Sequence, residues 1–65
     1  MTQQKQRDPR IDPQPADRVR VANETREVMG RYQGRVQYSW PGKLAVRSLS
    51  LPEWQRWAGR GEVAP

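Results

Sequence analysis

The sequence predicts a mainly β fold with a short C-terminal helix, in which the strands form a four-stranded antiparallel meander. From residue 18 onward, polar and apolar residues alternate with period two, which is typical of half-buried strands. Two dipeptides that favour tight turns, Gln33-Gly34 and Pro41-Gly42, separate the later alternating segments. After residue 50 the apolar spacing becomes that of a helix.

The first two strands follow from local alternation and turn chemistry. Arg18–Val21 alternates charged and β-branched residues and predicts the first strand. Thr25–Met29 predicts a weaker second strand, and Gly30 after it indicates a bulge or bend. The next turn, Gln33-Gly34, contains residues that tolerate positive φ and therefore indicates a hairpin.

The third strand is the clearest, because Val36, Tyr38 and Trp40 fall on one face and polar residues fall on the other. Pro41-Gly42 suits the two central positions of a type II turn. A fourth strand is predicted over residues 44–47, and the alternation breaks near Ser48-Leu49.

The last element is predicted as a helix of about two turns, which would be unstable alone and must pack on the sheet. Ser50 and Glu53 have the spacing of a capping box, and Pro52 falls in the first turn. Trp54 and Trp57 follow at helical spacing, so we expect them in the core. Gly59 and Gly61 are expected to end the helix.

Three regions are expected along the chain. Residues 1–16 contain three prolines and little apolar content, so they predict a disordered N-terminal arm. Residues 17–60 form the small β domain, and residues 61–65 are expected to be a frayed tail. Residues 1–17 carry no net charge, whereas residues 18–60 carry nine basic and three acidic side chains.

The composition limits the chemistry that this chain can perform. Its 65 residues allow one small domain, with a formal net charge of +5. It has no Cys and no His, which excludes disulfides, zinc–thiolate sites and imidazole catalysis. A chain of this length is not expected to form a ligand pocket of about 300 Å³ or more. We therefore expect no cofactor and no enzymatic activity.

No membrane association is expected from the sequence. The longest apolar run is Leu44-Ala45-Val46, whereas a membrane span needs about 20 apolar residues. No apolar segment typical of a signal peptide follows residues 1–7. These features predict a soluble, cytoplasmic protein, and we expect a monomer rather than an oligomer.

Two resemblances follow from the order and composition of these elements. A strongly bent meander with a closing helix over residues 17–58 resembles an SH3-like small barrel, as in Tudor and KOW modules. The Trp-rich segment Ser48-Leu49-Ser50-Leu51-Pro52-Glu53-Trp54-Gln55-Arg56-Trp57-Ala58 resembles the ending of small phage or prophage hypothetical proteins. The first resemblance implies a fold, and the second implies a phage or prophage origin without a biochemical function.

Nucleic acid is the predicted ligand, because an Arg-rich strand surface suits phosphate and aromatic rings can stack on bases. The alternative is a solvated basic face that keeps a small domain soluble. The candidate nucleic-acid-binding residues are Arg18, Arg20, Arg35, Arg47 and Lys43, with Arg26, Arg31 and Arg56 as possible extensions of the patch.

A protein partner is the second prediction, with Trp40 and adjacent apolar surface as the binding site, for example in a modulator of a host protein. The alternative places Trp40 in the core, because the chain has three Trp and no Phe. Tyr32 and Tyr38 either stack on bases or pack across strands.

Overall fold

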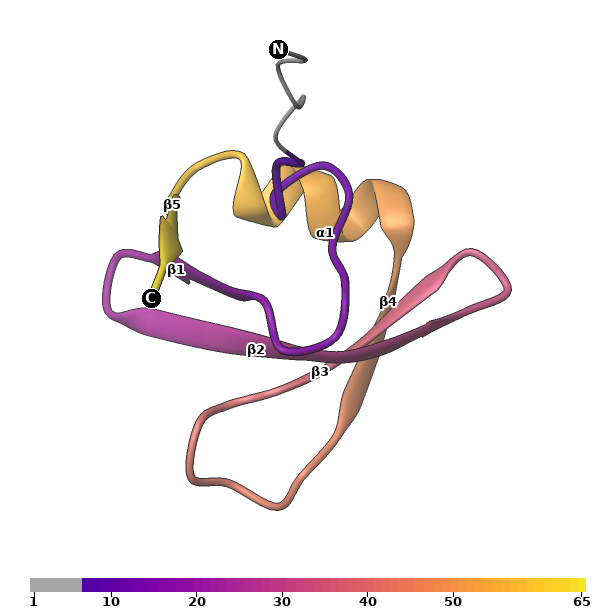
Figure 1. Ribbon diagram of the computed structural model, residues 1–65, viewed down its shortest axis with the longest axis horizontal. Helices are drawn as coiled ribbons and strands as arrows, with labels where there is room; N and C mark the ends of the chain where they lie inside the picture. Colours follow the sequence, from indigo (N-terminus) through magenta and orange to yellow (C-terminus); the bar gives the residue numbers. More distant parts are fainter. Residues whose placement is uncertain (1–6) are drawn as a thin grey trace, which may run out of the picture.

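The structure is a computed structural model that describes residues 7–65. Its strands form one antiparallel sheet in the order β4-β3-β2-β1-β5 (Figure 1). In chain order the elements are β1 (Arg18–Val21), β2 (Glu24–Tyr32), β3 (Arg35–Ser39), β4 (Arg47–Ser50), α1 (Leu51–Ala58) and β5 (Glu62–Ala64).

The predicted fold class, mainly β with a short C-terminal helix, is confirmed. The sheet has five strands rather than the predicted four. Strands β4 and β5 lie at opposite edges of the sheet and do not pair with each other, so the sheet is not a closed barrel. Each edge strand has only three or four residues, which limits the length of unpaired backbone at the edges.

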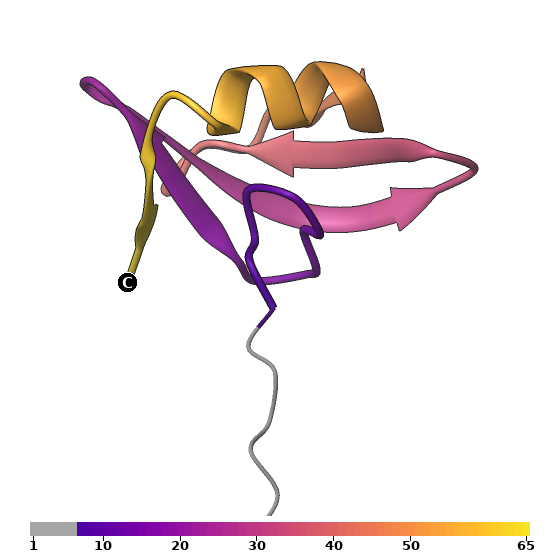
Figure 2. The same cartoon turned by 90° about the horizontal axis from the view of Figure 1, so that it is seen from above.

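Helix α1 lies across one face of the sheet and covers the apolar side chains there (Figure 2). We call this the helix face, and the opposite side the outer face. Partly buried Trp40, Leu49, Leu51 and Trp57 surround the core. The core itself consists of side chains that are at most 6% exposed: Val19, Val28, Val36, Tyr38, Trp54 and Ala58.

The predicted turns are confirmed. Gln33 and Gly34 have φ values of +50° and +77°, as a tight hairpin between twisted strands requires. Gly42 has φ +81°, and the Lys43 N–H donates to the Trp40 carbonyl at 2.9 Å, which closes the predicted turn. The register between β2 and β3 shifts just before Gly30, where a bulge was expected.

The predicted capping box at the start of α1 is also confirmed. The Ser50 hydroxyl accepts from the Glu53 N–H at 3.2 Å, and the Glu53 carboxylate accepts from the Ser50 N–H at 3.0 Å. Gly59 caps the C-terminal end of the helix.

The predicted position of the fourth strand is wrong. The sequence predicts it over residues 44–47, but β4 begins at Arg47 and runs directly into α1. Leu49 pairs with Val36, so the burial of Leu49 on the helix face sets the register. Residues 43–46 instead form an irregular loop, and their apolar alternation places no side chain in the core.

The N-terminal arm is packed where the structure describes it, contrary to the predicted disorder of residues 1–16. Pro9 and Pro13 are buried. The Trp54 indole Nε1 donates to the Pro9 carbonyl at 3.1 Å, and Gln55 Nε2 donates to the Ile11 carbonyl at 2.8 Å. Strand β2 also holds this segment, since the Ala16 N–H donates to the Val28 carbonyl at 2.9 Å and Arg31 Nη1 donates to the Pro13 carbonyl at 3.1 Å. The prediction for residues 1–6 lies outside the described residues.

The segment predicted as a frayed tail forms β5. Glu62–Ala64 pairs antiparallel with β1, so the sheet continues beyond the helix. Gly61 allows the chain to pass β1 closely, because a Cβ at this position would lie 2.0 Å from the Arg20 carbonyl oxygen. Sequence alternation cannot reveal a three-residue strand whose only partner is about 40 residues away in the chain.

The variant Gly61→Ala is expected to release β5 from β1, because the added methyl group collides with backbone atoms of Arg20. We expect a loss of about 1–3 kcal/mol in unfolding free energy, measured by chemical denaturation. Gly30→Ala is the control, since its Cβ would meet only the Gln37 side chain at 3.5 Å. Equal stability of the two variants would contradict this explanation.

Candidate functional site

The five predicted nucleic-acid-binding residues do not share one face. Arg18, Arg20 and Arg35 alternate with the buried Val19 and Val36, so they lie on the outer face. Arg47 pairs with Tyr38 and therefore lies on the helix face. Lys43 lies in the exposed loop before β4.

Arg18 and Arg20 have carboxylate partners from neighbouring strands. Arg18 Nη2 lies 3.5 Å from Glu27 Oε1 of β2, and Arg20 Nη2 lies 2.7 Å from Glu62 Oε2 of β5. These carboxylates offset the positive charge that the sequence predicts for this part of the sheet. The pairs join strands that are adjacent only in the folded protein, so the spacing of residues along the chain does not predict them.

The unbalanced positive charge lies in the second half of the chain. Residues 34–60 contain five basic side chains and one acidic side chain, Glu53. Over residues 7–65, five cations have no carboxylate within 4.0 Å: Arg35, Lys43, Arg47, Arg56 and Arg60. Arg60 is separate from the other four, because it lines a small hollow with Arg20 and Glu62.

The remaining four, Arg35, Lys43, Arg47 and Arg56, are called the β4-side cations here. Arg47 begins β4, Lys43 lies in the loop before it, Arg35 begins the neighbouring β3, and Arg56 lies in the last turn of α1, which follows β4. Because Arg35 is on the outer face and Arg47 on the helix face, the four border the β4 edge of the sheet from both faces. Arg35 Nε donates to the Ser48 hydroxyl of β4 at 2.6 Å. All four residues are exposed.

Glu53 is the one acidic residue near the β4-side cations, and its carboxylate stays charged while it accepts the hydrogen bonds of the helix cap. Hydrogen bonds from the backbone and hydroxyl of Ser50 lower the pKa of Glu53, and the positive charges of Arg35 and Arg56 lower it further. Arg56 lies three residues after Glu53 on α1, and the Leu51 N–H donates to the Gly34 carbonyl at 2.9 Å, so the start of β3 lies beside the start of this helix.

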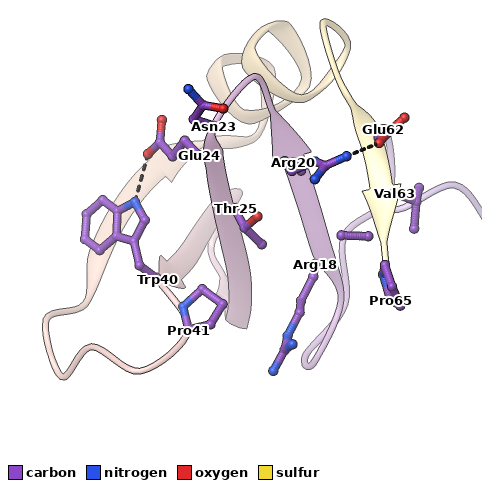
Figure 3. A pocket seen from close by; sticks show the side chains of 11 residues that line it. Arg18, Arg20, Asn23, Glu24, Thr25, Trp40, Pro41, Glu62, Val63 and Pro65 are labelled. Atoms are coloured by element: carbon purple, nitrogen blue, oxygen red, sulfur yellow. Dashed lines mark hydrogen bonds and ion pairs between the residues drawn. The ribbon is translucent and has the colours of Figure 1, made fainter.

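An open hollow of about 650 Å³ lies near β1 and β5 (Figure 3). Trp40 and Pro41 line one side of it, β5 lines the other, and Arg18 and Arg20 lie between. Its size exceeds what the chain length predicts for a pocket, because strands and termini form an open depression rather than an enclosed cavity.

The charges that line this hollow are balanced. Arg18 and Arg20 are matched by Glu24 and Glu62, and Glu62 is already paired with Arg20. Val63 and Pro65 add apolar surface beside the indole of Trp40. The hollow is therefore a weak attractor for phosphate, although it contains three of the six predicted site residues.

Trp40 is half-buried and held in place, rather than projecting freely as the protein-partner prediction requires. Its Nε1 donates to Glu24 Oε2 at 2.8 Å, and its ring meets Tyr38 edge to face at 5.5 Å. Trp54 is buried in the core, as predicted, whereas Trp57 is half-buried and packs against the core.

Arg26 contacts Glu24 and Tyr38, the same residues that hold Trp40. The prediction that Arg26 extends the exposed cationic patch is wrong. Its register opposite Val19 places it on the helix face, where its side chain is only 14% exposed. The guanidinium lies over the rings of Tyr38 at 4.5 Å and Trp57 at 4.0 Å, and Nε donates to Glu24 Oε2 at 2.8 Å. Such packing against aromatic faces suits a structural guanidinium.

The two tyrosines differ in how far their side chains are exposed. Tyr38 is 6% exposed and packs in the core, so it is not available for base stacking. Tyr32 is 63% exposed at the end of β2, opposite Arg35.

Comparison with known proteins gives no match to a family model, a curated protein or a solved structure. No helix within residues 7–65 has the length and apolar character needed to cross a bilayer. The described residues also contain no group of three or more carboxylates arranged to share a metal ion.

The Glu24 carboxylate is expected to make stability sensitive to acid. Hydrogen bonds from Arg26 and then Trp40 lower the pKa of Glu24 below its ordinary value of 4.5, although burial opposes this. The contribution of the Glu24 carboxylate to the free energy of unfolding is full above pH 4.5. It is lost as pH falls through the lowered pKa of Glu24 in the folded state. Glu24→Gln should lower the free energy of unfolding by about 1 kcal/mol at neutral pH. In acid the variant should lose less stability than the unmodified protein, because it has no carboxylate at this position to protonate.

Urea denaturation at several pH values, followed by tryptophan fluorescence, measures this effect. Glu62→Gln is the control, since Glu62 is more exposed and forms a single ion pair with Arg20. Parallel stability–pH curves for Glu24→Gln and the unmodified protein would show that Glu24 does not hold the cluster.

Proposed function

We propose that this protein is a small non-enzymatic domain that binds nucleic acid through the β4-side cations. One observation supports the proposal above all: residues 34–60 carry five basic side chains against Glu53 alone, while the acidic residues elsewhere pair with nearby arginines. The proposed site keeps Arg35, Lys43 and Arg47 from the sequence prediction, together with Arg56, which the sequence offered as an extension of the patch. Arg18 and Arg20 are omitted because of their carboxylate partners.

The chemistry of these side chains fits a phosphate backbone. Three of the four are arginines, whose planar guanidinium binds phosphate oxygens in a bidentate manner. Within residues 7–65 none of the four has a carboxylate within 4.0 Å, so binding phosphate does not require breaking an ion pair there. Each phosphate contact releases counterions, and four contacts give a slope of about −3.6 in log K against log salt for a duplex.

The hollow beside Trp40 is a second candidate site, for a protein partner. Its balanced charges and apolar walls suit a protein surface better than a polyanion. Binding there would depend on Trp40, Pro41 and Val63 and would vary little with salt.

Two charge-matched double variants test the proposed nucleic-acid site. Lys43→Gln/Arg47→Gln removes two β4-side cations, and Arg18→Gln/Arg20→Gln removes two paired arginines from the hollow. Both lower the net charge equally, so bulk charge is controlled. Fluorescence anisotropy with labelled single- and double-stranded DNA of about 25 nucleotides or base pairs gives affinity over about 50–200 mM salt.

The first double variant is expected to weaken binding and reduce the duplex salt slope by about 1.8, because two phosphate contacts are lost. The second is expected to change the slope much less. Equal losses in the two variants would mean that net charge, not this surface, attracts DNA. A larger loss in the Arg18/Arg20 variant would place binding in the hollow, and no binding by the unmodified protein at low salt would reject the proposed function.

A further inference from the structure

The loop between β3 and β4 presents an apolar side chain at an exposed position. Leu44 is 99% exposed, and Val46 in the same loop is 56% exposed. Neither side chain contributes to the core, although the chain has few large aliphatic residues with which to build one. A single exposed leucine is ordinary in itself. Leu44 differs in how its backbone is held and in the charges that surround it.

Hydrogen bonds fix the backbone on both sides of Leu44. Before it, the Pro41-Gly42 turn is closed by the Lys43 N–H, which donates to the Trp40 carbonyl at 2.9 Å. After it, the hydroxyl of Ser39, a residue only 4% exposed, donates to the Ala45 carbonyl at 2.5 Å. The tip of the loop between β3 and β4 is therefore anchored to the sheet, and Leu44 projects from it in a defined direction.

The surroundings of Leu44 are cationic. Lys43 and Arg47 flank it, and in the described part of the chain neither has a carboxylate within 4.0 Å. The sequence has no acidic residue from 28 to 52. The complementary surface is anionic and contains a narrow apolar slot.

Duplex DNA matches this description. Phosphates line both edges of its minor groove, and leucine is one of the apolar side chains that wedge between base steps and kink the helix. A bilayer fits less well, since even one acyl chain gives only marginal membrane binding and this tip offers two short side chains. A stable protein interface needs about 800 Å² from each partner, which the tip alone does not provide.

We propose that Leu44 inserts between adjacent base pairs of duplex DNA while Lys43 and Arg47 contact the flanking phosphates. This inference rests on the proposed function and specifies its ligand as a duplex and its mode of binding as wedge insertion. Insertion unstacks the base step and bends the DNA, so it is measurable separately from affinity.

The experiment uses the full chain and a duplex of about 25 base pairs that carries 2-aminopurine and donor and acceptor dyes at its ends. With the unmodified protein, 2-aminopurine fluorescence is expected to rise and the end-to-end distance to shorten. Leu44→Ala should abolish both signals but weaken binding by about tenfold or less, because the phosphate contacts remain. Leu44→Met should retain both signals.

Ile11→Ala is the matched control, because Ile11 is 60% exposed on the N-terminal arm, away from the β4 loop in sequence. It is expected to bind, unstack and bend DNA like the unmodified protein. Because Leu44 is almost fully exposed, Leu44→Ala should unfold at the same temperature as the unmodified protein, which circular dichroism checks.

The outcomes separate the wedge from the function on which it depends. Duplex binding without unstacking or bending, or equal bending by Leu44→Ala, would overturn the wedge and leave the proposed function standing. Binding of single-stranded DNA alone would overturn the wedge only, whereas no binding of either single- or double-stranded DNA at low salt would overturn both. Leu44-dependent binding to vesicles of anionic lipid, with no unstacking of DNA, would also overturn the wedge and assign the loop to a membrane surface.

Discussion

Burial of Trp54 is the interaction that joins the three parts of this small fold. Its fully buried ring packs against Tyr38 of β3 at 6.0 Å, and its Nε1 donates to the Pro9 carbonyl of the N-terminal arm at 3.1 Å. An eight-residue helix is not stable alone in water, so α1 exists because this side chain anchors it to the sheet. The same anchor explains why a proline-rich segment with little apolar content packs against the domain.

The arrangement of the strands also determines where the positive charge is free. On the β1 side, antiparallel neighbours place Glu27 beside Arg18 and Glu62 beside Arg20. On the β4 side, the segment from 28 to 52 supplies no acidic residue, and Glu53 is held by the helix cap. Arginine is spread along the chain, but within residues 7–65 the arginines of β1 have carboxylate partners and the cations near β4 do not. This asymmetry of charge is the basis of the proposed function.

Local features could be predicted from the sequence, because their physics involves adjacent residues. The Gln33-Gly34 and Pro41-Gly42 turns and the Ser50–Glu53 cap depend on backbone conformation and bonds within a few positions. Features that depend on distant contacts were not predictable: β5 requires the passage of Gly61 close to Arg20, and the arm requires the indole of Trp54. For the same reason the sequence correctly predicts that Arg20 and Arg35 are exposed, but it does not predict the packing of Arg26 against Tyr38 and Trp57. Nor does it reveal which cations have carboxylate partners.

The most direct test of the charge asymmetry is an amide NMR titration of the labelled protein with short single- and double-stranded DNA at low and physiological salt. We expect shifts around Arg35, Lys43, Leu44, Arg47 and Arg56 that fade as salt rises, with little change at Arg18 and Arg20. Shifts centred on β1 and β5, or no shifts at low salt, would contradict the assignment of the free positive charge to a nucleic-acid surface.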